Sequence, residues 1–181
     1  DSGDSMTDVS CWRAIFSMGG YQESGGVTVY APRETSPADT VVVILDAVNP
    51  TIGSTTDIKD NSWHHVALVK NSGTSTLYID GTSEGSVSDS NNYNYSGAVT
   101  VGRDNNCISG GYNNSYFQGF ISNLRVTKGQ ALYTSNFTPS TEALTTTSQG
   151  ATASNVKLLC FQSAESFWDV TKSPATPETS W

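Results

Sequence analysis

Three short β-type segments joined by glycine-containing turns place the strongest limit on the fold of this chain. Segment 62–70 is dense in β-branched and aromatic residues, and a turn at 71–74 leads from it into segment 75–79. Asp80-Gly81 then leads into a weaker segment, 82–88. An Asp-Gly pair between two such runs is a strong hairpin signal. The sequence therefore predicts a three-stranded antiparallel meander.

Further strand-like segments lie along most of the chain. Segment 41–45 is continuously apolar, which is typical of a strand buried on both faces. The other predicted strands are 14–18, 26–31, 98–102, 116–127 and 156–161, while 49–54 is predicted as loop and 128–133 as a single helical turn. Many strands with frequent turns and almost no helix predict an all-β, two-sheet antiparallel β-sandwich.

Composition excludes two classes of partner. The chain has 181 residues, with 9 Lys and Arg against 17 Asp and Glu, and a formal net charge of −8. An acidic surface repels phosphate backbones, so nucleic-acid binding is not expected. No apolar run approaches the roughly 20 residues that span a bilayer, so membrane insertion is not expected either.

The length fits one domain with a substantial core. We expect residues 1–14 to be an N-terminal lead or incomplete first strand, 15–162 to be the sandwich, and 163–181 to be a C-terminal arm or linker. The three cysteines, Cys11, Cys107 and Cys160, are an odd number, so at least one is free or pairs with another chain. Their spacing fits no zinc motif.

Four segments carry a further pattern when they are read in order. They are residues 63–69, 77–81, 101–103 and 116–126. In combination they resemble the laminin-G-like, or concanavalin-A-like lectin/glucanase, jelly roll over about residues 15–162. The stretch 126–139, followed by 156–160, is similar to versions in large structural proteins of marine bacteriophages. The resemblance implies a concanavalin-A-like sandwich in a virion or extracellular setting.

The chain departs from this family pattern at its start. Members open with a strand bearing Phe and Trp just before the counterpart of segment 15–17, where this chain has a Ser- and Asp-rich lead with Cys11-Trp12 as a partial substitute. Either the chain is a segment of a longer polypeptide, or a neighbour supplies the strand, because an unpaired sheet edge binds other strands. We therefore expect an oligomer and contacts with other structural protein chains.

The titratable residues give no support for catalysis. Glucanases of this fold carry paired carboxylates about 5–5.5 Å apart, at Glu-x-Asp-x-x-Glu-like spacing, and no such motif occurs here. His64 and His65 are adjacent, so their side chains should point to opposite faces of a strand, where core packing or a backbone hydrogen bond is expected. A Ser-His-Asp triad stays open because its members can lie far apart in sequence. A non-enzyme is the favoured interpretation.

A calcium site is one interpretation of the loop that follows segment 98–102. Calcium prefers oxygen ligands, and in the resembling family loop Asp and Asn side chains supply them. Asp104 and Asn105 are therefore candidate metal ligands. The alternative is that both are ordinary loop residues.

Two loops rich in tyrosine and asparagine are the candidate ligand-binding sites. Tyrosine offers a flat face for stacking on a sugar ring and asparagine offers a paired donor and acceptor. The candidates are Tyr93, Asn94, Tyr95, Tyr112, Asn113 and Asn114. The favoured function is a non-catalytic binding or adhesion module that recognises a glycan or cell-surface receptor. The alternatives are a structural or decoration subunit whose loops bind protein chains, and, less favoured, a glycoside hydrolase or lyase.

Overall fold

The computed structural model describes residues 13–20, 23–31, 40–104 and 116–162. Every strand pairing in this part of the chain is antiparallel, and the described residues contain no α-helix. The prediction of an all-β antiparallel fold is confirmed. The predicted lead and arm fall largely outside the described residues and stay predictions.

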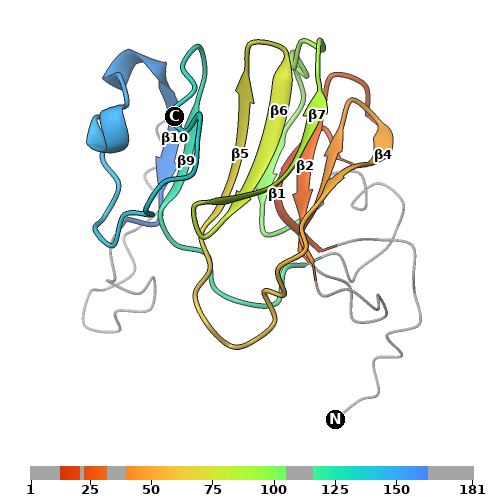
Figure 1. The fold of residues 1–181 in the computed structure, drawn as a ribbon. Coiled ribbons are helices and arrows are strands. Elements are labelled where there is room, and N and C mark those ends of the chain that lie inside the picture. The colour runs from red at the N-terminus through yellow and green to blue at the C-terminus, as the bar shows by residue number, and fades with distance from the viewer. Residues whose placement is uncertain (1–12, 21–22, 32–39, 105–115, 163–181) are drawn as a thin grey trace, which may run out of the picture.

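The strands form sheets of five, three and two strands (Figure 1). The order in the five-stranded sheet is β4 (Val48–Gly53), β3 (Val42–Leu45), β2 (Val27–Tyr30), β1 (Ala14–Met18) and β8 (Val99–Val101). The three-stranded sheet is β5 (Val66–Asn71), β6 (Thr74–Ile79) and β7 (Thr82–Ser88), and the two-stranded sheet pairs β9 (Leu124–Thr127) with β10 (Val156–Cys160). Two 3-10 turns, η1 (Ser148–Gly150) and η2 (Ala153–Asn155), precede β10.

The main core lies between the five-stranded and three-stranded sheets. Val43 of β3 and Ile52 of β4 belong to the same buried cluster as Leu77 and Ile79 of β6. Alternation along β2 and β3 sends Tyr30 and Ile44 to the opposite face of the five-stranded sheet, where they are also buried, with Ala14. Both faces of β3 are therefore covered, as its continuous apolar run predicted.

The predicted meander is confirmed, and its two turns have the conformation that tight hairpins favour. Asp80 and Gly81 have φ of 51° and 80°, and Ser72 and Gly73 have φ of 48° and 81°. Positive φ at both central residues is the type I′ turn, whose twist matches that of the flanking strands. The β6–β7 turn thus places Asp80 at one end of the sandwich in a fixed orientation.

Predictions for three segments were wrong, and segment 62–70 becomes a strand only from Val66. Segment 49–54 was expected as loop but lies mostly in β4, an edge strand, where a proline such as Pro50 is tolerated because an edge strand has one unpaired side. Of segment 116–127, only β9 is a strand, with an isolated bridge between Tyr116 and Arg103. Segment 128–133 forms no helical turn, because Gly129 has φ of 88°, which a right-handed helix does not accommodate.

Candidate functional site

Tyr93, a predicted ligand residue, is tied into the protein by its own side chain. Its hydroxyl donates a hydrogen bond to Asp89 Oδ2 at 2.7 Å, and the Lys70 ammonium lies 4.9 Å from its ring centroid. Ser75 donates to the same buried carboxylate. Burial and the neighbouring Asp89 carboxylate raise the pKa of the Tyr93 hydroxyl. One ring face and the hydroxyl are thus engaged within the fold.

The other predicted ligand residues differ in exposure. Tyr95 is half-buried: its ring lies against Gly97 and Gly19, and its amide donates to the Gly25 carbonyl at 3.4 Å. Asn94 is exposed on the same loop. Tyr112, Asn113 and Asn114 lie outside the described residues. Ligand binding by these six residues stays a prediction.

Asp104, the predicted calcium ligand, is buried and lies shortly after β8 in the chain. Its Oδ2 accepts a hydrogen bond of 2.5 Å from the hydroxyl of Tyr30, which is also buried. Calcium takes six to eight oxygen ligands, and no group of three or more acidic, His or Cys side chains that could hold a metal ion occurs among the described residues. Asn105 lies outside them, so calcium binding by this pair remains a prediction.

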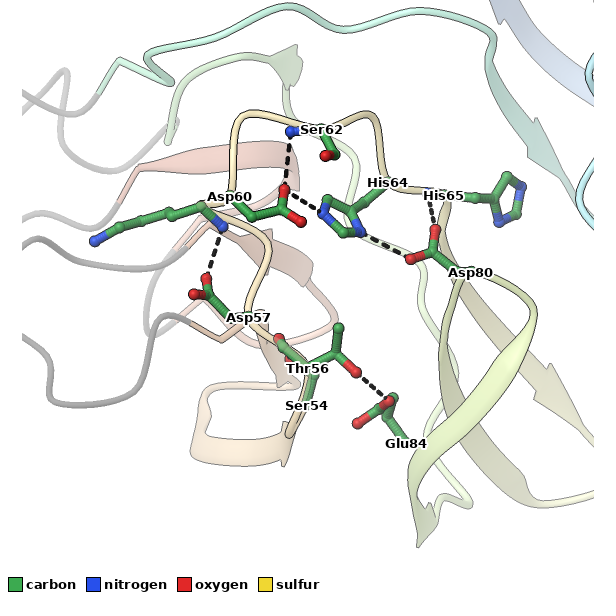
Figure 2. Close-up of polar contacts among 10 residues, drawn as sticks. Ser54, Thr56, Asp57, Asp60, Ser62, His64, His65, Asp80 and Glu84 are labelled. Carbon is green, nitrogen blue, oxygen red and sulfur yellow. Dashed lines mark hydrogen bonds and ion pairs between the residues drawn. The ribbon is translucent and has the colours of Figure 1, made fainter.

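A second polar site, which the sequence interpretation missed, lies on residues 54–65, the connection from β4 to β5 that we call the clasp loop. Two of its aspartates shape it locally. Asp57 Oδ1 accepts from the amide of Lys59 at 2.7 Å, and Asp60 Oδ1 accepts from the amide of Ser62 at 2.8 Å (Figure 2). Side-chain bonds to the backbone two residues on are characteristic of Asx turns. The loop is therefore folded by its own sequence.

His64 joins the clasp loop to the β6–β7 turn. Its Nε2 lies 2.9 Å from Asp60 Oδ1 and its Nδ1 lies 2.8 Å from Asp80 Oδ2. Asp80 Oδ1 also accepts from the amide of His65 at 2.7 Å. The hydrogen bonds to Asp80 and Asp60 raise the pKa of His64, and the bond to His64 lowers the pKa of Asp60. The His64 side chain is only 13% exposed.

The other end of the clasp loop is held by β7. Glu84 Oε2 accepts from the amide of Thr55 at 2.8 Å and also from its hydroxyl, and Oε1 accepts from the Thr56 hydroxyl at 2.6 Å. These bonds lower the pKa of Glu84 to about 2. Both ends of the clasp loop are thus fixed to the three-stranded sheet.

The β6–β7 turn is itself supported by an aromatic cluster. The amide of Phe137 donates to the Gly81 carbonyl at 2.9 Å, and its ring stacks on Tyr133 with centroids 3.6 Å apart. His65 meets both rings edge-on, and burial lowers the pKa of His65. The expectation of core packing thus fits His65, whereas His64 forms the polar bridge to Asp60 and Asp80.

Trp63 lies on the clasp loop directly before His64 and is 70% exposed. The sequence interpretation placed it inside a strand, because it continues the apolar run of β5. Asp57 and Asp60 could have indicated a loop here, because an aspartate side chain often accepts a hydrogen bond from the backbone amide two residues later and so favours a turn. The structure therefore presents an exposed indole on a loop fixed at both ends.

A family profile for the concanavalin A-like lectin/glucanases superfamily matches residues 6–134. The chain belongs to this superfamily. The match confirms the resemblance drawn from the segments around Trp63 and Gly81, and it includes the clasp loop. The superfamily's description covers both sugar-binding lectins and sugar-cleaving glucanases, so membership leaves the choice between binding and catalysis to the site.

Among solved structures, the chain is similar to an S-layer domain-containing protein (residues 221–444) from Clostridium thermocellum ATCC 27405. The two are 20% identical with a TM-score of 0.34, and the match covers 68% of this chain and 60% of that one. Our chain thus spans less than two thirds of the length of that structure. A similarity with so low a TM-score carries no argument about function. A comparison with curated proteins found no match. Within the described residues, no helix has the length and apolar character of a membrane span.

Proposed function

We propose that this chain is a non-catalytic binding module on the surface of an extracellular assembly, such as a phage tail or capsid, and that it recognises a neutral host glycan through Trp63. The observation that carries the proposal is the 70% exposure of the Trp63 side chain on a loop fixed at both ends. An indole face stacks on the apolar face of a sugar ring, and a loop already held in place loses little entropy on binding.

Polar residues that could orient a sugar directly adjoin Trp63 in the sequence. Asn61 and Ser62, which are exposed, directly precede Trp63 in the chain. Amide and hydroxyl groups provide both donors and acceptors for sugar hydroxyls. The clasp loop carries Lys59 and His64 as well as Asp57 and Asp60, while the protein as a whole has a formal charge of −8. A neutral glycan is therefore favoured over a sialylated or sulfated one, which the net negative charge of the protein would repel.

The carboxylates of this region do not have the properties of a glycosidase pair. A catalytic acid needs a raised pKa so that it is protonated when it meets the substrate. Asp60 and Glu84 both have lowered pKa values, and both accept hydrogen bonds from residues of the clasp loop. These contacts support a role in holding the loop and favour binding over hydrolysis.

Glycan-array binding of the wild type and of Trp63→Ala tests this function. We expect binding to neutral glycans that falls at least about tenfold, or 1.4 kcal/mol, when the indole is removed. Phe120→Ala is the matched control, because the Phe120 side chain is 86% exposed but lies outside the clasp loop. Equal binding by the wild type and Trp63→Ala would exclude Trp63 as the platform, and binding lost equally in both variants would indicate a general defect.

A structural or decoration subunit is the second candidate, favoured by other exposed apolar side chains. Phe120 and Phe161 are exposed, and Val99 is exposed on β8, an edge strand of three residues. Exposed aromatics and unpaired edges are common in protein–protein contacts. Light scattering tests this candidate: an oligomer that Phe120→Asp dissociates supports it, and a monomer at all concentrations contradicts it.

A further inference from the structure

The imidazole of His64 lies between two carboxylates from different parts of the chain, Asp60 of the clasp loop and Asp80 of the β6–β7 turn (Figure 2). A neutral imidazole carries one N–H and can donate to only one of them, leaving the lone pair of its other nitrogen facing the second. Only the imidazolium donates to both. Two ionised carboxylates at hydrogen-bond distance from both ring nitrogens therefore favour the protonated form of His64.

The two contacts of His64 fix different parts of the structure. The bond between Asp60 and His64 closes a short ring of chain that contains Asn61, Ser62 and Trp63. The bond between His64 and Asp80 ties that ring to the turn that the Phe137 segment supports. When the proton is lost, at least one contact becomes a repulsion between a lone pair and a carboxylate. The chain segment 60–64, which carries Trp63, then loses either its contact between Asp60 and His64 or its contact with Asp80.

In the described part of the chain, no titratable side chain other than Asp60 and Asp80 forms a hydrogen bond with His64. On its own loop, Asp57 accepts from the amide of Lys59. On β7, Glu84 is engaged with Thr55 and Thr56 at the other end of the loop. His65, the next residue, is directed into the aromatic cluster. Among the described residues, Asp60 and Asp80 are therefore the titratable side chains that hydrogen-bond His64.

We propose that His64 is a pH-responsive latch: its imidazolium holds the clasp loop and Trp63 in the binding position, and loss of its proton releases the loop and weakens glycan binding. The effect on glycan binding rests on the proposed function, whereas the release of the loop does not.

The direction of the pH effect follows from the raised pKa of His64. A histidine whose pKa is higher in the folded than in the unfolded protein stabilises the folded state. This contribution is complete at pH values below the pKa of the unfolded state, here the ordinary 6.5. It is lost as the pH rises through the pKa of the folded state. The latch is therefore closed in mildly acidic solution and opens on the alkaline side of 6.5. This is the opposite direction to a switch built on a buried neutral histidine, such as His65.

NMR titration of the protein alone tests the latch without a glycan. The His64 ring signals should titrate above pH 6.5, and the Trp63 indole signal should shift with the same midpoint. Asp60→Asn should lower that midpoint, because it removes one of the two charges, while Asp57→Asn, the matched change elsewhere on the loop, should leave it unchanged. A His64 midpoint at or below 6.5, or an indole signal that does not follow it, overturns the proposal.

The same glycan array, probed at pH 6.0 and pH 8.5, tests the consequence for binding. We expect the wild type to bind at least about fivefold more weakly at the higher pH, and His64→Gln, which does not titrate, to bind equally at both. A pH-independent wild type contradicts control of binding by the latch. If no glycan binds at either pH while the NMR midpoints behave as expected, the proposed function fails and the latch stands.

Discussion

Replacing Gly81 by alanine should destabilise the protein by about 2–4 kcal/mol, because this glycine supports the turn that anchors the clasp loop. Its φ is 80°, in the left-handed region, and an added Cβ would overlap the carbonyl oxygen of Phe137 and lie 2.9 Å from the carbonyl carbon. The alanine variant must therefore accept backbone strain and also displace the Phe137 segment.

The magnitude is a sum of separate effects. A left-handed alanine costs roughly 1–2 kcal/mol. Moving Phe137 breaks its 2.9 Å hydrogen bond to Gly81, worth about 0.5–1.5 kcal/mol. It also disturbs ring contacts with Tyr133 and Tyr78, worth about 0.5–1.5 kcal/mol each when fully lost. The smaller conformational freedom of alanine in the unfolded chain returns about 0.4–1 kcal/mol.

Urea unfolding followed by circular dichroism measures the loss, and Gly73→Ala is the control. Gly73 has the same position in the same type of turn, with φ of 81°, but the atom nearest to an added Cβ is 4.0 Å away. We expect Gly73→Ala to lose about 1 kcal/mol or less, since it carries strain without overlap. Equal losses in the two variants would refute the reasoning, because the Phe137 contact would then contribute nothing.

Three further predictions concern other contacts. Tyr93→Phe should cost about 1–3 kcal/mol in urea unfolding, because it removes a hydrogen bond to the buried Asp89 carboxylate; no loss would leave the hydroxyl available to a ligand. Glu84, with its pKa lowered from 4.5 to about 2, contributes stability above pH 4.5 that is lost as pH falls toward 2, so Glu84→Gln should lose less stability over that interval when unfolding is followed across pH. A calcium site at Asp104 and Asn105 requires a higher Tm in calcium than in EDTA, and Asp104→Asn should abolish that difference.

Local turn chemistry explains which parts of the fold could be predicted from the sequence. The β5–β6–β7 meander could be predicted because Gly73 and Gly81 stand where type I′ turns require positive φ. The turn between β3 and β4 uses Asp46 and Ala47, with φ of 51° and 66°, so no glycine marks it. Since Pro50 also argues against a strand, β4 was interpreted as loop.

The candidate site was harder to predict, because its contacts join residues far apart in sequence. Alternation correctly separates the directions of His64 and His65, but it does not say that Asp80 faces one of them; the β5–β6 register does. Tyr93 carries the chemistry of a sugar ligand, yet Lys70 and Asp89 engage it across the fold. In both cases the residue type indicates which interactions the side chain can form, whereas tertiary packing determines which partner it forms them with.

The pairing pattern of the strands also has a consequence for the order in which they form. β3 with β4, β5 with β6, and β6 with β7 are joined by two-residue turns, whereas β8 pairs with β1 through residues as distant as Phe16 and Val101. Closing a long loop costs entropy before the distant contacts form. The hairpins that hold both ends of the clasp loop should therefore assemble early in folding, and the short β8 edge should join last and open first.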